Sequence, residues 1–147
     1  LNEKEKGRVI EDVMAEGLGV ENQNVVSDDY NSPVDLTHHE ERGSIQVKSR
    51  ALDIDNRWKF DFENIDNYDT LCLIGLNRSF RVIEEAWMIP TDELVKMLYN
   101  KIERESISIY KDRFSEYNEF KIDHKPYNDI LQKRINESKN ISNNIEG

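Results

Sequence analysis

The apolar residues in the first third of the chain predict one helix followed by short strands. Residues 3–16 carry apolar side chains at helical spacing, and "GLG" at residues 17–19 favours the end of that helix. Three strands are expected next, over residues 23–27, 33–36 and 44–49, with "HHEERG" as the hairpin connection between the last two. The pattern therefore predicts a helix and then a three-stranded meander.

The third of these strands has two faces of different character. Ile45 and Val47 alternate with Gln46 and Lys48, and successive side chains of a strand point to opposite faces. Gln46 and Lys48 are therefore expected to share one face. Asp35, on the neighbouring strand, can approach that face.

The middle of the chain predicts a buried strand pair and a helix. "ENIDNYD" at residues 63–69 is typical of a short helix or turn, and it leads into the apolar strand 70–76. Residues 81–90 form a further strand. Residues 91–99 then predict an amphipathic helix that Thr91 can cap.

The last third of the chain is less regular. Residues 106–122 are ambiguous between helix and strand. Pro126 suits the first turn of a last helix that reaches residue 135, where apolar residues again recur at helical spacing. Residues 136–147 are rich in Asn and Ser, and we expect them to be disordered.

This order of elements predicts an α/β fold in which helices flank a mixed β-sheet. A chain of 147 residues with 37% hydrophobic content suits a single domain, because it can build one core but hardly two. We place that domain at residues 1–135, with its core at about 5–99 and a helical extension at about 100–135. No repeat or linker divides it.

The composition of the chain bears on the cellular compartment in which the protein is expected. The longest apolar runs fall short of the roughly 18–20 residues that a membrane span needs, and no signal-peptide pattern opens the chain. Cys72 is the single cysteine, so a disulfide framework is excluded, and we expect it to be buried and inert. These features predict a cytoplasmic protein without a membrane partner. A first residue other than Met suggests a processed chain or a domain of a longer protein.

The formal net charge of −10 argues against a general electrostatic attraction to DNA, because that attraction comes mainly from Lys and Arg at phosphates. It suits instead a non-catalytic protein that binds a basic partner or mimics DNA. Any DNA-directed function has to rest on a local site.

The strongest candidate for such a site is the segment "SPVDLTHHEERGSIQVKSR". The carboxylate of Asp35, the amide oxygen of Gln46 and the carbonyl of Val47 are the oxygen ligands that a hard cation such as Mg²⁺ prefers. The ammonium of Lys48 beside them can orient an attacking water or stabilise charge on a phosphoryl oxygen. The chemistry that fits this set is phosphodiester hydrolysis.

"SPVDL" followed by "GSIQVKSR" resembles the PD-(D/E)xK nuclease superfamily. The likeness is closest to archaeal Holliday-junction resolvases and Mrr-like restriction endonucleases, in which Gln can occupy the acidic position of the last motif. "EKGRVIEDVMAE" is similar to the first helix of the family. The resemblance covers about residues 5–90 and implies a restriction-endonuclease-like sheet with an α-β-β-β-α-β core.

The resemblance also implies roles for individual residues. Asp35 would be the central metal ligand, Gln46 a neutral second ligand and the Val47 carbonyl a third. Lys48 would position water or stabilise charge, and Glu11 would be an additional ligand through water. The ion would be Mg²⁺, with Mn²⁺ as a substitute. Gln46 departs from the usual carboxylate, which weakens metal binding unless another acid compensates.

The function expected from this resemblance is that of a Mg²⁺-dependent endodeoxyribonuclease. Restriction, homing and junction resolution all remain open. Because one site cuts one strand, the protein would act as a homodimer or attached to a separate DNA-binding module. The alternatives are the acidic binding or DNA-mimic protein and an inactive module with a nuclease fold.

Other polar clusters have simpler interpretations. His38 and His39, with the glutamates that follow them, lack the spacing typical of zinc ligands and are expected at a polar hairpin tip. Glu84 and Glu85 are expected on an exposed strand or a bulge rather than in a second acidic site.

Several basic side chains flank the candidate site, namely Arg42, Arg50, Arg57 and Lys59. They can bind phosphates or form solvated surface, and the sequence leaves both readings open. Trp58 can stack on a base or pack in the core, and we favour the core.

Overall fold

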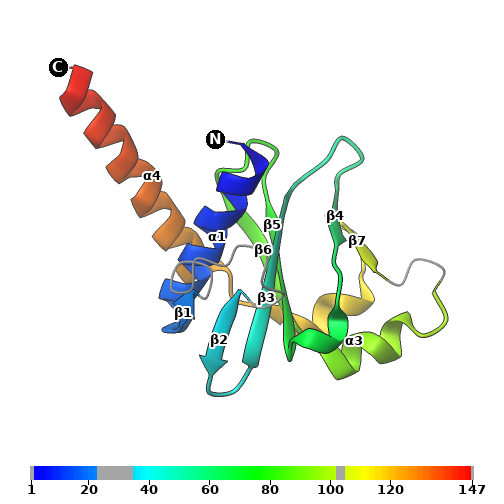
Figure 1. Ribbon diagram of the computed structural model, residues 1–147. Helices are drawn as coiled ribbons and strands as arrows, with labels where there is room; N and C mark the ends of the chain where they lie inside the picture. The colour runs from blue at the N-terminus through cyan, green and yellow to red at the C-terminus, as the bar shows by residue number, and fades with distance from the viewer. Residues whose placement is uncertain (1, 23–34, 102–104, 147) are drawn as a thin grey trace.

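A six-stranded mixed sheet forms the centre of the computed structural model, which describes residues 2–22, 35–101 and 105–146 (Figure 1). The strand order is β1-β2-β3-β5-β6-β8. β3 and β5 are parallel, and every other neighbouring pair is antiparallel. The strands are β1 (Glu21–Asn22), β2 (Leu36–His39), β3 (Gly43–Ala51), β5 (Thr70–Leu76), β6 (Ile83–Pro90) and β8 (Lys121–Ile122).

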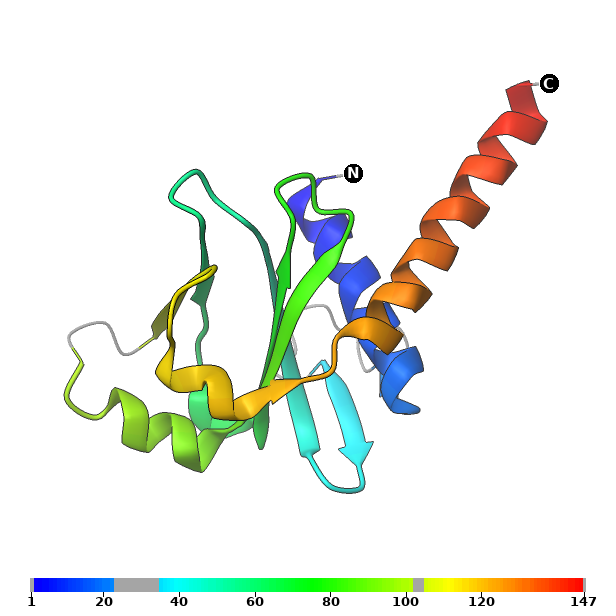
Figure 2. The same ribbon diagram turned by 180° about the vertical axis from the view of Figure 1, so that it is seen from behind.

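The two faces of this sheet are covered differently. α1 (Glu3–Leu18) and α4 (Lys125–Glu146) lie on one face, and Figures 1 and 2 show both helices on that side. α3 (Thr91–Leu98) lies toward the other side, together with a two-stranded antiparallel sheet of β4 (Arg57–Asp61) and β7 (Ser106–Tyr110). Two 3-10 helices, Ile65–Asn67 and Glu116–Phe120, complete the described elements. The fold is mixed α/β, as the sequence predicted, but the α-β-β-β-α-β core expected from the resemblance lacks its second α-helix, because β4 and a 3-10 turn occupy the chain between β3 and β5.

The structure has two hydrophobic cores where the sequence analysis expected one, because the alternation of side chains gives both faces of the sheet apolar residues. The first core joins α1 and α4 to the sheet and includes Ile10 of α1 and Ile45 and Val47 of β3. The second core lies on the other face and includes Leu71 and Leu73 of β5. β5 thus contributes to both cores, which explains why all of its residues are apolar or small and buried.

The first helix forms where the sequence predicts it and extends two residues further. The side chain of Asn2 accepts a hydrogen bond from the Glu5 N–H, and the Glu5 carboxylate accepts one from the Asn2 N–H. This reciprocal capping satisfies two N–H groups at the start of the helix. Gly19, with a left-handed φ of 69°, ends it.

The order of the meander is confirmed, but β2 shares only Leu36 with the strand predicted over residues 33–36 and continues through His39, so its last two residues lie in a strand and not in the predicted connection. β1, β2 and β3 are successive antiparallel neighbours, and His39 is paired with Gly43 at the hairpin. The strand predicted over residues 23–27 and the first part of the one predicted over 33–36 lie outside the described residues. The alternation of β3 is as predicted, because Ile45 and Val47 are in the first core while Gln46 and Lys48 point to the opposite face.

β4 is an element that the sequence analysis did not place. Its Trp58 and Phe60 are fully buried in the second core, so the prediction that Trp58 packs in the core is confirmed. The Trp58 indole N–H donates to the Leu76 carbonyl at 2.7 Å. Its ring lies on Gly75, where an added Cβ would come within 2.7 Å of ring carbon. A side chain at this position of β5 would displace the indole.

The prediction of a helical extension from about residue 100 is wrong in its first half. The segment contains β7, a 3-10 helix and β8, and a long helix begins only at Lys125 with α4. Ile107 and Ile109 are buried, and their two-residue spacing fits a strand that pairs with β4. This pairing partner lies nearly fifty residues earlier, so local spacing alone did not reveal it.

Two further expectations need correction. α4 continues through Glu146, where the Asn- and Ser-rich composition favoured a disordered tail. Thr91 does not cap α3, because its hydroxyl donates to the carbonyl of Tyr68 at 3.1 Å. That bond fastens the start of α3 to the segment before β5. No helix among the described residues has the length and apolar character to cross a membrane.

Candidate functional site

Asp35 lies against the edge of β3, where the pairing with β2 ends. Its N–H donates to the Ile45 carbonyl at 3.0 Å, and its Oδ2 accepts the N–H of Val47 at 2.8 Å. These two contacts bracket Gln46. Asp35 is 3% exposed and is the one charged side chain among the buried residues of the described ranges. A carboxylate this deeply buried requires compensating partners, and the main chain of β3 provides one.

The carbonyl of Val47 points toward the same edge as its N–H. In a strand the N–H and C=O of one residue project to the same side, and the Val47 N–H is directed at Asp35 rather than at β5. The Val47 carbonyl therefore lies on the side of β3 that faces Asp35. The structure brings these two predicted ligands together.

Gln46 presents an amide oxygen with no partner among the described residues. Its Oε1 is buried and accepts no hydrogen bond there. The same holds for the hydroxyl of Thr37 on β2, which points to the same face because Leu36 before it is in the first core. A buried oxygen without a partner costs about 1–3 kcal/mol, so this position is energetically suited to a cation or water.

Lys48 lies two residues after Gln46 on β3, and its side chain points to the same face of the sheet. It is half-buried and is paired in register with Leu73 of the second core. Within the described ranges its ammonium forms no hydrogen bond or ion pair. Its three donors are therefore available to a ligand on this face.

Tyr68 is a neighbour of the site that the sequence analysis did not identify. It is buried, and burial together with the nearby charge of Asp35 raises the pKa of its hydroxyl to about 12. The hydroxyl donates to the Glu63 carbonyl at 3.4 Å. Nothing in the sequence indicates that Tyr68 lies near Asp35, because the two residues come together only in the folded sheet.

Glu11 lies on α1 and not on the sheet that carries the other predicted site residues. It is half-buried on α1, the helix that packs on the first core with Ile10 and Met14. Gln46 and Lys48 point to the opposite face. The structure does not bring Glu11 to that face, and its role as a water-mediated ligand stays a prediction.

The acidic residues of the described ranges do not form a cluster that would bind metal by charge alone. No three His, Cys, Asp or Glu side chains gather there closely enough to hold an ion. A cation at this edge would rely on one carboxylate, that of Asp35, and on the neutral oxygens of Gln46 and Val47. Mg²⁺ commonly uses one or two carboxylates and retains several waters, so this set is compatible with it.

The flanking basic residues have separate positions. Arg57 is held by Asp53, with Nε 2.9 Å from Oδ2, and this contact raises the pKa of the guanidinium. Arg42 lies toward the first core, where its charge lowers the pKa of Cys72 against the larger rise caused by burial. Arg50 follows Lys48 on the same face of β3. Its Nη1 donates a hydrogen bond to the Ser49 carbonyl at 3.1 Å.

The other polar clusters are accounted for by local structure. His39 Nδ1 accepts the N–H of Arg42 at 2.9 Å and so holds the hairpin, while the side chain of His38 lies outside the described residues. Glu84 is the extra residue of a bulge in β6 and pairs with Lys111 at 3.1 Å. Cys72 is fully buried, as expected.

No protein-family model matches the chain, and no curated protein matches it.

Proposed function

We propose that the protein is a divalent-metal-dependent DNA endonuclease with a restriction-endonuclease-like fold. The observation that carries this proposal is the contact of the Asp35 carboxylate with the main chain of β3 at Val47, between Gln46 and Lys48. This contact joins two residues twelve positions apart in the chain, one from each of the two segments on which the resemblance rests.

The order of elements supports the fold part of the proposal. α1 is followed by the meander β1-β2-β3 and then by β5, which lies parallel beside β3. Between β3 and β5 the chain forms β4 and a 3-10 turn where the α-β-β-β-α-β core has a helix. The order of the sheet strands therefore agrees with the expected core, and its one intervening helix is replaced.

The donors at the edge of β3 fit a hard cation. Asp35 supplies a carboxylate, Val47 a main-chain carbonyl, and Gln46 a buried amide oxygen that no described residue satisfies. When bound, Mg²⁺ supplies a Lewis acid for the scissile phosphate and lowers the pKa of a coordinated water. Because only one donor is charged, we expect weak affinity.

The residues of the chain have distinct tasks in this proposal. The main chain of β3 fixes the orientation of Asp35 through two hydrogen bonds. Lys48, which has no acidic partner among the described residues, donates to the attacking water or to a phosphoryl oxygen. Tyr68 keeps its proton, because its pKa is about 12, and helps to hold a buried environment beside Asp35.

The charge of the protein bears on its partners. With a net charge of −10, the domain needs help to approach DNA. We propose that it works as a homodimer or together with a separate DNA-binding module in the cytoplasm. The substrate can be a restriction site, a homing site or a branched junction.

Cleavage of supercoiled and branched DNA with Mg²⁺ or Mn²⁺ tests the proposal. Wild type is compared with Asp35→Asn and Lys48→Met, after circular dichroism shows that all three are folded. The matched control is Lys121→Met, which removes a lysine that pairs with Glu85 on β6. Metal-dependent cleavage by wild type and the control, lost in the two site variants, supports the proposal.

A second candidate is a nuclease-like fold without activity, and the neutral Gln46 favours it. Such a protein would bind DNA or a partner without hydrolysis. Wild-type protein that neither cleaves any of these DNAs nor binds Mn²⁺ contradicts the nuclease proposal. If wild type does not cleave DNA and Gln46→Glu does, the absence of a carboxylate at position 46 is the cause of the inactivity.

A further inference from the structure

A groove of about 780 Å³ lies between α1, α4 and the turn that joins β5 to β6, apart from the Asp35 site. Its floor is apolar and continuous with the first core, since Ile10 and Leu131 are buried members of that core. The remaining apolar lining residues are Val9, Phe80 and Ile135. The proposed cleavage chemistry does not use this groove.

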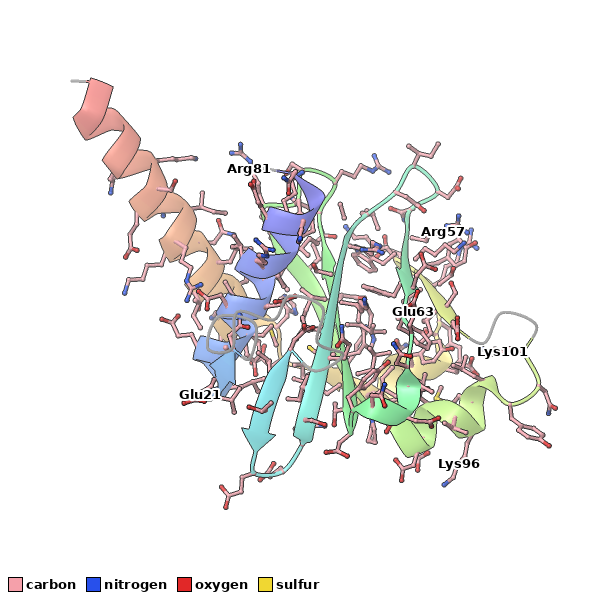
Figure 3. The ribbon with its side chains drawn as sticks, in the orientation of Figure 1. Glu21, Arg57, Glu63, Arg81, Lys96 and Lys101 are labelled. Carbon is pink, nitrogen blue, oxygen red and sulfur yellow. The ribbon has the colours of Figure 1, made fainter. Side chains whose placement is uncertain are left out.

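The rim of the groove is basic, whereas the chain as a whole is acidic. Five basic side chains and one acidic side chain, Asp12, line it in a protein whose net charge is −10. The basic residues are Lys6, Arg8, Arg81, Arg134 and Lys139. They come from three separate elements, and Figure 3 shows Arg81 at the end of the molecule where α1 begins. The local field therefore favours an anion.

The cations of the rim fall into two kinds. Arg134 is fixed by Asp12, with Nη1 and Oδ2 2.8 Å apart, and the Lys6 ammonium lies 5.7 Å from the centroid of the Phe80 ring. Arg81 and Lys139 are exposed, and their side chains form no ion pair or hydrogen bond within the described ranges. A ligand can bind these two without breaking an existing contact.

The size of the groove suits a small molecule better than a partner helix. On α1 the lining runs from Lys6 to Asp12, which corresponds to about 10 Å of helix. That is about two turns, shorter than the stripe over which a partner helix usually packs. The volume lies within the range of about 300–1,000 Å³ typical of small-molecule sites. A DNA backbone would leave the apolar floor unused.

We infer that this groove binds a small amphipathic anion. The headgroup, a carboxylate, sulfonate or phosphate, lies between Arg81 and Lys139. The apolar body lies on the partly exposed side chains of Val9, Phe80 and Ile135, beneath which the buried core begins. The inference is independent of the nuclease proposal, because it shares no residue with the Asp35 site.

Two fluorescent probes of similar shape test the inference on the full chain. 8-Anilinonaphthalene-1-sulfonate carries an anionic group, whereas N-phenyl-1-naphthylamine has the same ring framework without it. The double variant Arg81→Glu/Lys139→Glu is compared with wild type and with Lys59→Glu/Lys96→Glu, which changes the net charge equally at exposed positions outside the groove. Circular dichroism confirms that the three proteins fold alike.

If the groove binds an amphipathic anion, the sulfonate should bind wild type and the control double variant with similar affinity. The groove variant should bind it about tenfold more weakly, since four units of charge change near the headgroup. Binding of the neutral probe should change less than about twofold. Added decanoate should displace the sulfonate from wild type, and decanol at the same concentration should not.

Three results would overturn the inference. The first is the absence of saturable binding of the sulfonate to wild type. The second is an equal loss of affinity in the control variant and the groove variant, which would reduce the effect to net charge. The third is binding of the neutral probe that follows the sulfonate in every protein, which would exclude recognition of the headgroup.

Discussion

β3 and β6 belong to the same sheet, yet they differ in the pairing of their charged side chains, although each strand has a buried oxygen without a hydrogen-bond partner among the described residues, Oε1 of Gln46 and Oε2 of Glu84. On β6, Glu84 and Glu85 each have a lysine partner, Lys111 at 3.1 Å and Lys121 at 3.2 Å. On β3, Gln46 has a buried oxygen without a partner and Lys48 no ion pair within the described ranges.

This difference distinguishes charged side chains that are paired within the fold from charged side chains that can still bind a ligand. A glutamate paired with a lysine is already neutralised, and a half-exposed pair of this kind contributes little to stability. A buried amide oxygen without a partner has a cost that folding alone does not explain, and a half-buried ammonium without an ion pair remains available to a ligand. Groups of this second kind are the ones expected at a binding or catalytic site.

The largest expected effect comes from Asp35. Asp35→Asn keeps an oxygen that can accept the Val47 N–H but removes the charge, so metal-dependent cleavage should fall on the order of 1,000-fold while the fold is retained. Asp35→Ala should also lose about 1–3 kcal/mol of stability, because the Val47 N–H is left buried without a partner. Cleavage rates and urea denaturation measure the two effects. Equal cleavage by Asp35→Asn and wild type would remove Asp35 from the site.

Lys48→Met should lower the cleavage rate about 100-fold, because it keeps the aliphatic stem beside Leu73 and removes the donor. Lys121→Met, on β8 and paired with Glu85 of β6, should leave the rate unchanged and lower the free energy of unfolding by at most about 1 kcal/mol. Single-turnover kinetics at saturating Mg²⁺ compare the two lysines. If both substitutions slow cleavage alike, the contrast between the strands has no functional meaning.

Gln46→Glu should tighten Mn²⁺ binding about five- to tenfold, since a second carboxylate joins Asp35. Without metal, the two carboxylates repel each other, and the variant should be less stable than wild type near neutral pH. Thermal unfolding with and without Mn²⁺ shows both effects. Asn100→Asp, at an exposed position after α3, adds the same charge and should show neither.

The smallest effect concerns Tyr68, whose pKa is raised to about 12 in the folded protein. Because the unfolded tyrosine loses its proton near pH 10, this residue contributes stability that is present below about pH 10 and is lost as the pH approaches 12. Tyr68→Phe should therefore lose less stability than wild type over this interval. Parallel urea denaturations from pH 9 to pH 11.5 give the comparison, and identical slopes for the two proteins would refute it.

The sequence predicted those parts of β3 that depend on local periodicity. The alternation of Ile45 and Val47 with Gln46 and Lys48 is visible in four residues, and the structure confirms which pair is buried in the first core. The apolar run of β5 was equally plain, and its bounds agree with the structure.

What the sequence could not provide are contacts between distant segments. The hydrogen bond from the Val47 N–H to Asp35 depends on where the pairing of β2 with β3 ends. β4 and β7 find each other across almost fifty residues, so neither was recognised as part of a sheet. Glu11 illustrates a related limit, because helical spacing selected it while the packing of α1 decides which face of the sheet it reaches.

A calorimetric titration with Mn²⁺ tests the central claim, that the edge of β3 at Asp35 holds a divalent cation. Wild type is compared with Asp35→Asn and with Glu85→Gln, which removes one carboxylate charge from the paired cluster on β6. The account predicts one Mn²⁺ per chain for wild type and Glu85→Gln, and at least about tenfold weaker binding for Asp35→Asn. Equal Mn²⁺ affinity in wild type and Asp35→Asn would contradict it.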